Sequence, residues 1–519
     1  MKKFYPVVLT ALCILLPANS QAGKAPNDLQ TKLTLLMVGF NKGKIRPPKA
    51  MGYLEEKLAS SKRKNDKSMI YKTMAEILYY QKYPTLSAMF ASKSLKLSKD
   101  PSGSFMKNNW TILARVSKSY PIQYILEDLA SVKKFSNITP PAFANNWRYV
   151  VGNAQLTKNH KKKALKSFLK LTVGDRYFLP AQYQVAMIYH GQGDYKNAEI
   201  ALRTILSPQS RSVSPISNTE KAKVLNYAYM ALGRLLYEQR NFVQATRYYR
   251  QISRESPLFY RSLFEQGWSL FLSGNPQHAL GSLHGANSPF FGNQFNPESK
   301  VLEAMIFYWL CRYEDSRNSL ADFAENHSKS VELLRGFLDR KRLSPDTAYQ
   351  LFENLISGVS GDSLGIPRKV LQTAAEEDSM LLLRDQYATL LGERQKLEGS
   401  DFALEEIGFS TLRNVLDEKI EKIQKGIGKQ YLVELRSLKE EFDELYAQSQ
   451  FLYLELLMSE KEQLLGRELH ATTKVTKISE SKNIRDWSNK TQSWARGKDE
   501  FWWDEIGFHI VDVKPQCKL

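Results

Sequence analysis

Small residues recur in pairs along the middle of this chain, and the two members of each pair stand twelve positions apart. Small side chains at this interval let two antiparallel helices of about 12 to 14 residues approach closely, because a large side chain at either position would push them apart. The pairs are Gly152 with Ala164, Ala186 with Ala198, Gly233 with Ala245, Gly267 with Ala279, and Ala304 with Ser316. Bulky residues follow the second members by four positions: Phe168, Leu202, Tyr249, Leu283 and Leu320. The pattern predicts five helix pairs between residues 145 and 330.

Successive pairs keep a nearly constant register. The steps between their first members are 34, 47, 34 and 37 residues, and the long step contains a Ser- and Pro-rich stretch at 207–219 that predicts a loop insertion. Gly-Gln-Gly-Asp at 191–194 and Ser-Gly-Asn-Pro at 273–276 fall where a helix pair must reverse. The chain resembles the tetratricopeptide repeat family, whose unit has 34 residues, most closely over 186–198 and 232–257. That resemblance implies an α-solenoid whose concave groove takes an extended peptide or a partner helix. A helical solenoid of another family is the alternative.

Helical patterns extend to the N-terminal side of the repeats. Residues 23–144 are expected to form a degenerate helical region, because Ala75 and Ala88 stand 13 apart and an apolar periodicity begins at Trp110. The basic stretch 41–72 is either an arm that contacts an anionic surface or, as is more common for such stretches, a solvated loop and helix face.

The C-terminal half has a different composition. Residues 331–370 are expected to form a partly helical linker with a loop at 357–367. An apolar stripe within 371–480, with Glu and Lys on the other faces, predicts a long helical hairpin or a short coiled coil. The glycines of Gly426-Ile-Gly-Lys429 are expected to form its turn or a kink. The stripe consists of Leu435, Leu438, Phe442, Leu445, Ser449, Leu452 and Leu456. The predicted fold class is therefore all-α: a tetratricopeptide-type solenoid, then these helices, then a short aromatic tail.

That tail, residues 481–519, concentrates tryptophans and then alternates in polarity like a strand. Its aromatic residues are either a docking patch or a lid folded onto the helices. A folded lid is favoured, because exposed tryptophans promote aggregation. The residues concerned are Trp494, Trp502, Trp503 and Phe508.

The N-terminus has the pattern of a signal peptide over residues 1–22. Two lysines precede the apolar run Phe4–Leu16, and Ser20 and Ala22 place small residues before a cut at Gly23. The chain is therefore expected to be exported and periplasmic. No later segment is apolar for about 18 residues, so no transmembrane helix is expected in the mature chain.

The net charge and the cysteines of the chain gain meaning from the expected periplasmic location. The net charge of +19 favours acidic partners. Export argues against nucleic acid, so the alternatives are an acidic cell-wall or membrane surface as partner, or charge that is scattered over a solvated surface. Cys311 and Cys517 are the cysteines that follow the signal peptide, and in an oxidising compartment they are a candidate disulfide. The alternative is one buried thiol and one free thiol in the tail.

The order of these segments resembles periplasmic repeat proteins of gliding and predatory bacteria. The likeness is carried by the stretch from Trp502 to Phe508, by Cys517 near the end, and by Cys-Arg-Tyr-Glu-Asp at 311–315. Some of those relatives are assembly partners in envelope-spanning gliding-motility machinery, so the resemblance implies a role of that kind.

Motifs for catalysis are not found in the sequence. It contains no His-Glu-x-x-His, no Cys-x-x-Cys and no Gly-x-Ser-x-Gly, and its seven histidines are scattered, so we expect no catalytic residue, metal or cofactor. The remote enzyme alternative is a lytic transglycosylase, for which Ser-Glu-Ser at 479–481 is a poor match because no apolar, Gly-rich context follows it. The function expected is a non-catalytic scaffold that binds other envelope proteins. A structural protein that binds the cell wall or an anionic polymer is the second hypothesis.

Overall fold

The computed structural model of the chain describes residues 28–136, 140, 143–291, 295–339, 343–358, 366–465, 492–494, 503 and 506–517. Over these residues the fold is all-α, as the sequence predicts, with 23 α-helices and two strands of three residues each. No helix within these ranges is long and apolar enough to cross a membrane. The predicted signal peptide, residues 1–22, and the Ser-Glu-Ser stretch at 479–481 lie outside the described residues.

Seven helices make up the N-terminal region, and α3 and α4 form its centre. Ser68 at the start of α3 and Ser94 near the end of α4 exchange hydrogen bonds, each hydroxyl donating to the other's backbone carbonyl at 2.8 and 2.7 Å. The two helices therefore run antiparallel and in close approach. The elements are α1 (Asp28–Asn41), α2 (Pro47–Ser60), α3 (Lys64–Tyr80), α4 (Pro84–Leu97), the 3₁₀ helix η1 (Ser104–Met106), α5 (Lys107–Val116), α6 (Gln123–Ala130) and α7 (Lys133–Ser136).

Five helix pairs follow: α8 with α9, α10 with α11, α13 with α14, α15 with α16, and α17 with α18. The loop predicted at 207–219 is wrong in part, because it contains α12. Ser207 caps this helix by accepting the N–H of Ser210, and Pro208 stands in its first turn, where a fixed φ and a missing N–H cost nothing. The elements are α8 (Ala144–Thr157), α9 (Lys161–Phe168), α10 (Phe178–His190), α11 (Tyr195–Leu206), α12 (Pro208–Val213), α13 (Asn218–Glu238), α14 (Phe242–Tyr249), α15 (Phe259–Leu272), α16 (Pro276–Ala286), the 3₁₀ helix η3 (Pro289–Phe291), α17 (Glu298–Trp309) and α18 (Tyr313–Leu338).

A single helix of 56 residues, α23, dominates the C-terminal part. The turn predicted as one alternative at Gly426-Ile-Gly-Lys429 is wrong, because α23 continues through it. Gly428 serves a different purpose: the backbone carbonyl of Pro345, at the start of α19, lies where a side chain at position 428 would be. The elements are α19 (Pro345–Ile356), α20 (Arg368–Ala375), α21 (Asp378–Glu398), α22 (Asp401–Glu405), α23 (Phe409–Leu464) and the parallel strands β1 (Gln492–Trp494) and β2 (His509–Val511).

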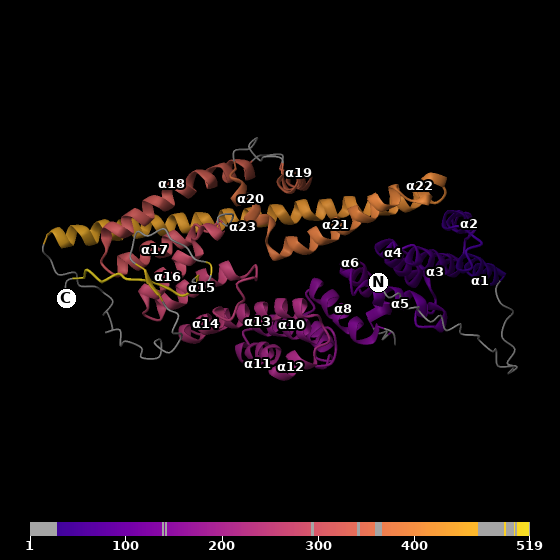
Figure 1. The fold of residues 1–519 in the computed structure, drawn as a ribbon, viewed down its shortest axis with the longest axis horizontal. Helices are drawn as coiled ribbons and strands as arrows, with labels where there is room; N and C mark the ends of the chain where they lie inside the picture. Colours follow the sequence, from indigo (N-terminus) through magenta and orange to yellow (C-terminus); the bar gives the residue numbers. More distant parts are fainter. Residues whose placement is uncertain are drawn as a thin grey trace, which may run out of the picture.

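The long helix spans most of the length of the structure in Figure 1, and of the five helix pairs it packs against the last one, α17 and α18. Near its start it contacts α4 and α21, and the short α22 just before it contacts α2; farther along it packs against α19, α18 and α17. The predicted apolar stripe faces these helices, with Leu435, Phe442 and Leu456 all buried. One hydrophobic core therefore joins the N-terminal region to α18–α23, and a second fills the helix pairs from α9 to α15.

Candidate functional site

The ten small residues of the repeat are all buried on the facing helices of the five pairs. A side chain at Gly233 would place its Cβ atom 2.6 Å from Tyr249 Cε1, closer than real contacts allow. In the fifth pair the Ser316 hydroxyl donates to the Ala304 carbonyl oxygen at 2.9 Å. The same kind of glycine contact occurs in three pairs: Phe168 on Gly152, Tyr249 on Gly233, and Leu283 on Gly267. These residues set the spacing of the helices and do not face a ligand.

The variant Gly233→Leu is expected to lower the free energy of unfolding by about 1–3 kcal/mol, because the new side chain must displace the ring of Tyr249 from a packed interior. Denaturant titration followed by circular dichroism measures the change. The control is Gly336→Leu in α18, where a Cβ atom would have no neighbour within 4 Å and stability should stay equal or rise slightly. An unchanged unfolding midpoint in Gly233→Leu would remove the assigned packing role.

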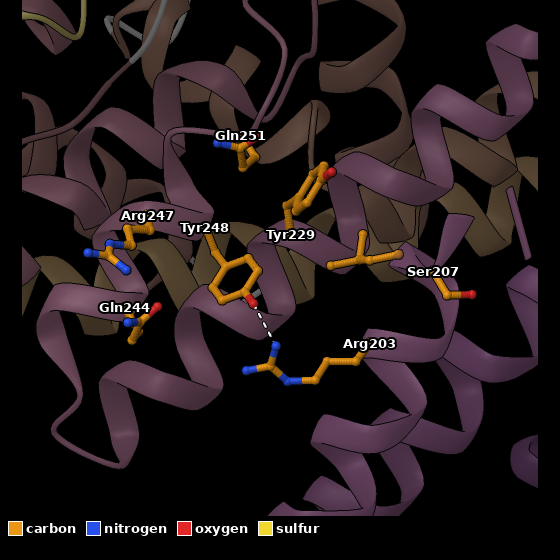
Figure 2. Close-up of a pocket in the computed structure, with 8 residues that line it drawn as sticks. Arg203, Ser207, Tyr229, Gln244, Arg247, Tyr248 and Gln251 are labelled. Atoms are coloured by element: carbon orange, nitrogen blue, oxygen red, sulfur yellow. Dashed lines mark hydrogen bonds between the residues drawn. The ribbon is translucent and has the colours of Figure 1, made fainter. Parts of the chain in front are cut away.

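A polar pocket of about 460 Å³ lies between α11, α13 and α14 (Figure 2). The Arg203 guanidinium donates to the Tyr248 hydroxyl at 2.8 Å and to the Glu199 carboxylate at 2.7 Å. The lining contains Arg, Gln, Ser, Tyr and Leu, so it has neither a carboxylate nor an imidazole for general acid–base chemistry. Its chemistry suits contact with an anion, with Arg203 and Arg247 as the cations.

A second, apolar groove of about 600 Å³ lies between α15, α17 and α23. Its walls come from distant parts of the chain: Trp309 belongs to α17 and Phe451 to α23. Glu455 is the one charged residue of the lining and makes no ion pair with any described residue. The lining residues are Phe271, Met305, Tyr308, Trp309, Ala447, Gln448, Phe451, Leu452 and Glu455.

From the groove onward, residues 451–458 of α23 are apolar except for Glu455, and the polar run 459–463 separates them from Leu464 and Leu465. Leu452 and Leu456 pack inward, while Phe451 and Met458 are 64% and 68% exposed. A helix that is apolar all round is normally buried, and apolar side chains that gather on a surface mark an interaction site. The exposed residues of this segment are Phe451, Tyr453, Leu454, Leu457, Met458, Leu464 and Leu465. We name this segment, residues 451–465, the apolar end of α23.

Glutamate side chains lie close together near the first turn of α17, away from the apolar end of α23. The Trp268 indole N–H donates to Glu298 at 2.9 Å. Burial, with the nearby charges of Glu441 and Glu265, raises the pKa of Glu298. Burial also raises the pKa of Glu441, together with the charges of Glu377 and Glu444, while Arg261 acts in the opposite direction. Like charges are thus held close together on this side of a chain whose net charge is +19.

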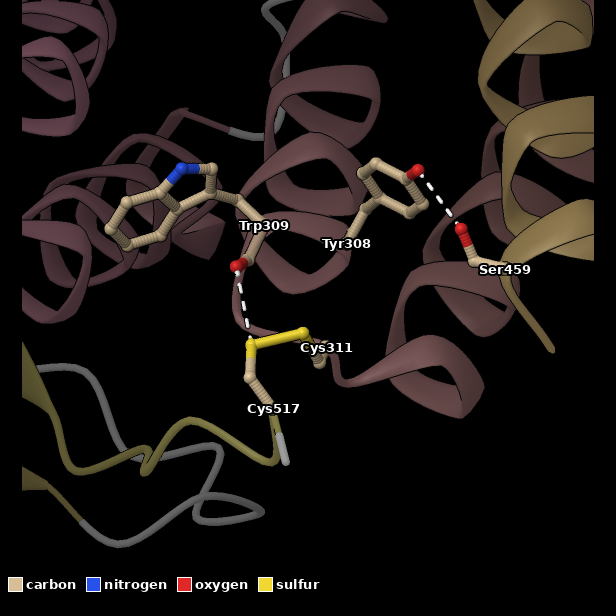
Figure 3. The surroundings of a disulfide bond; sticks show 5 residues. All are labelled: Tyr308, Trp309, Cys311, Ser459 and Cys517. Carbon is tan, nitrogen blue, oxygen red and sulfur yellow. Dashed lines mark hydrogen bonds between the residues drawn. A yellow bond between two sulfur atoms is a disulfide. The ribbon is translucent and has the colours of Figure 1, made fainter. Parts of the chain in front are cut away.

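The tail is fastened to the last helix pair by a disulfide between Cys311 and Cys517, whose Cα atoms are 5.0 Å apart (Figure 3). One residue earlier, the N–H of Gln516 donates to the Leu310 carbonyl at 2.9 Å. Cys311 has a positive φ of 56°, so it ends the reversal between α17 and α18 with its side chain directed at the tail.

Residues 506–513 of the tail lie against α15 and α16. Ile506 and Val513 are buried, and the backbone of His509 passes over Gly281, where a Cβ atom would overlap its carbonyl oxygen. Burial, with the neighbouring His284, lowers the pKa of His509 to about 4, so its imidazole is neutral at physiological pH.

The four aromatic residues predicted to form a docking patch or a lid differ in their surroundings. Trp503 is 42% exposed and meets the rings of Phe290 and Phe259 edge-on at 5.4 and 6.2 Å. The Arg254 guanidinium lies over the ring of Phe508. Trp494 contributes its backbone to β1, opposite Val511, and Trp502 lies outside the described residues.

Within the described ranges, no group of three His, Cys, Asp or Glu residues is placed to hold a metal ion. No protein-family model matches the chain, and no curated protein matches it at a significant level. The assignment of function therefore rests on the residues and the geometry described above.

The groove between α17 and α23 was missed by sequence reasoning, which gave attention to the repeat and to the tail. One signal is readable in the sequence: residues 451–458 are apolar at every position except Glu455, a pattern that indicates a helix covered on more than one face.

Proposed function

We propose that this chain is an exported, non-catalytic scaffold that binds other proteins of the cell envelope. The observation that carries the proposal is the apolar end of α23, where seven large apolar side chains are exposed next to an apolar groove. Such a surface is costly in water and is retained where it is covered by a partner.

The repeat supports the same proposal. Five helix pairs with small residues at their contacts are what a tetratricopeptide-type α-solenoid requires, and solenoids of that type present a groove to peptides or helices. The chain's likeness to periplasmic repeat proteins of gliding bacteria suggests an envelope-spanning assembly of the motility type as the setting.

Crosslinking mass spectrometry of the tagged protein in its native envelope tests this function. We expect specific links from residues 145–465 to one or two envelope proteins. The variant Phe451→Glu should lose links near α23, whereas Leu404→Glu, on α22 and 82% exposed, is the matched control and should keep them. Links to abundant bystanders alone would contradict the scaffold.

Binding of an anionic cell-wall polymer is the second candidate. The net charge of +19 and the pocket with Arg203 and Arg247 favour it. Electrostatic binding weakens steeply as salt rises, while apolar docking weakens much less. Recovery in the cell-wall fraction that falls sharply between low and high salt, without specific protein links, would select this candidate.

A further inference from the structure

A hydrogen bond between α17 and α23 holds the two helices that form the groove at a set distance from each other. The two helices run in the same direction, because Glu298 and Glu441 lie close at one end and the Tyr308 hydroxyl lies 3.1 Å from the Ser459 hydroxyl at the other. Figure 3 shows Tyr308 directed toward Ser459 on the long helix, with Trp309 directed to the other side. The groove is therefore a preformed feature, braced beside its apolar half.

Its chemistry changes along its length. Its apolar half is lined by Trp309 and Met305 of α17, by Phe451 of α23, and by Phe271, whose ring meets that of Trp309 edge-on at 6.0 Å. Toward the other half, Glu444 follows Glu441 along α23, and Glu455 stands within the apolar half. Glu444 and Glu455 make no ion pair with the described part of the chain.

We propose that this groove binds an amphipathic helix of a partner protein whose apolar face covers Trp309 and Phe451 and whose basic flank meets Glu444 and Glu455. The inference rests on the proposed function and adds the chemistry of the partner. Charged groups across an interface are arranged with opposite sign, so a carboxylate rim on a basic chain selects a basic partner.

The shape of the groove selects a helix over an extended strand. Both walls are helices, whose backbone groups are already bonded within each helix, so an extended peptide would find no row of main-chain partners there. A helix needs only side-chain contacts, and it packs its apolar ridge into the space between two parallel helices.

Charge also decides against other occupants. A second copy that docked through the same groove would bring its own Glu444 and Glu455 toward those of the first, and like charges that meet at an interface repel each other. An anionic lipid surface is repelled by the same carboxylates. A basic amphipathic helix suits both the apolar lining and the carboxylates of the groove.

Binding of designed peptides to the full mature protein tests the proposal. The probe is a synthetic, fluorescently labelled peptide of Leu, Ala and Lys with Leu at helical spacing. Its comparisons are a twin with Glu in place of Lys and a scrambled peptide of the same composition. Fluorescence anisotropy should show the basic helix binding at least about tenfold more tightly than either comparison peptide.

Three variants locate the site. Phe451→Glu should weaken the basic helix about tenfold or more, because it places a charge in the apolar half. The double variant Glu444→Gln/Glu455→Gln should reduce the preference for the basic over the acidic twin. Leu404→Glu, exposed on α22, should leave both affinities unchanged, and circular dichroism checks that each variant is folded.

Several results would overturn the proposal. Equal binding of the acidic twin or of the scrambled peptide would reject the partner chemistry, and full affinity in Phe451→Glu would reject the groove. Self-association in sedimentation experiments that Phe451→Glu abolishes would show that a second copy is the occupant. Binding of anionic vesicles that Phe451→Glu abolishes would assign the surface to a membrane. If the peptide controls or Phe451→Glu reject the proposal, specific crosslinks to envelope proteins would still support the scaffold. Failure of this inference is therefore distinguishable from failure of the proposed function.

Discussion

The variant Cys517→Ser is expected to lower the free energy of unfolding by about 4–5 kcal/mol. The disulfide closes a loop across a sequence separation of 206 residues, and the stabilisation from a crosslink grows with the length of the loop it closes. Denaturant titration of the oxidised wild type and of the variant measures the difference.

The local consequence is release of the tail. Without the crosslink, residues 506–513 would still be kept on α15 and α16 by the buried side chains of Ile506 and Val513 and by hydrogen bonds such as the one from Gln516 to Leu310, but their ends would be less constrained. Hydrogen exchange in that segment should therefore rise in the variant, while exchange in α3 and α4 should stay as in wild type.

Cys311→Ser and the double variant provide the control. Because the two cysteines act through one bond, each single variant and the double variant should have the same stability, and a reductant should bring the wild type to that level. A reductant that leaves the wild type unchanged would show that the bond does not constrain the unfolded chain in this protein.

What the sequence predicted well is the packing that occurs between neighbours along the chain. The ring of Tyr249 lies on Gly233, and both residues belong to one helix pair joined by a short turn. A local pattern of small and bulky residues reports such a contact directly, so the five helix pairs and the all-α class were readable.

Glycine is harder to interpret where the residue it contacts is distant in sequence. The sequence predicts a turn or a kink at Gly426-Ile-Gly-Lys429, but in the structure the missing side chain of Gly428 admits the backbone of Pro345 from α19. Tertiary contact outweighs the intrinsic cost of about 1 kcal/mol for glycine within a helix. Nothing adjacent to Gly428 in sequence shows that α19 will arrive there.

The candidate site could not be predicted for a related reason. Its two walls, around Trp309 and Phe451, meet only after α23 has folded back along the helix pairs. The stripe from Leu435 to Leu456 predicted that α23 buries one face, but the stripe does not specify which helices cover it. Only the apolar end of α23 gave a direct sign that a surface stays open to a partner.

A contact between α21 and the N-terminal region supplies the second large effect. Glu393, on α21 and 6% exposed, accepts hydrogen bonds from the backbone N–H groups of Thr85 and Leu86 in the first turn of α4. Helix N-termini carry unpaired N–H groups and a partial positive charge, so a carboxylate there satisfies both. Burial raises the pKa of Glu393, while these hydrogen bonds lower it.

Replacement of Glu393 by Ala should therefore lower the free energy of unfolding by about 2–5 kcal/mol, because two N–H groups would lose their acceptor in a buried site. Glu398→Ala is the control: its carboxylate lies one turn farther along α21, is 45% exposed and stands 3.8 Å from Arg394, so its loss should change stability by less than about 1 kcal/mol. Hydrogen exchange at Thr85 and Leu86 should rise in Glu393→Ala and stay slow in the control. If water took the place of the carboxylate without cost, the two variants would unfold at the same denaturant concentration, and the contact between α21 and α4 would then be held by apolar packing alone.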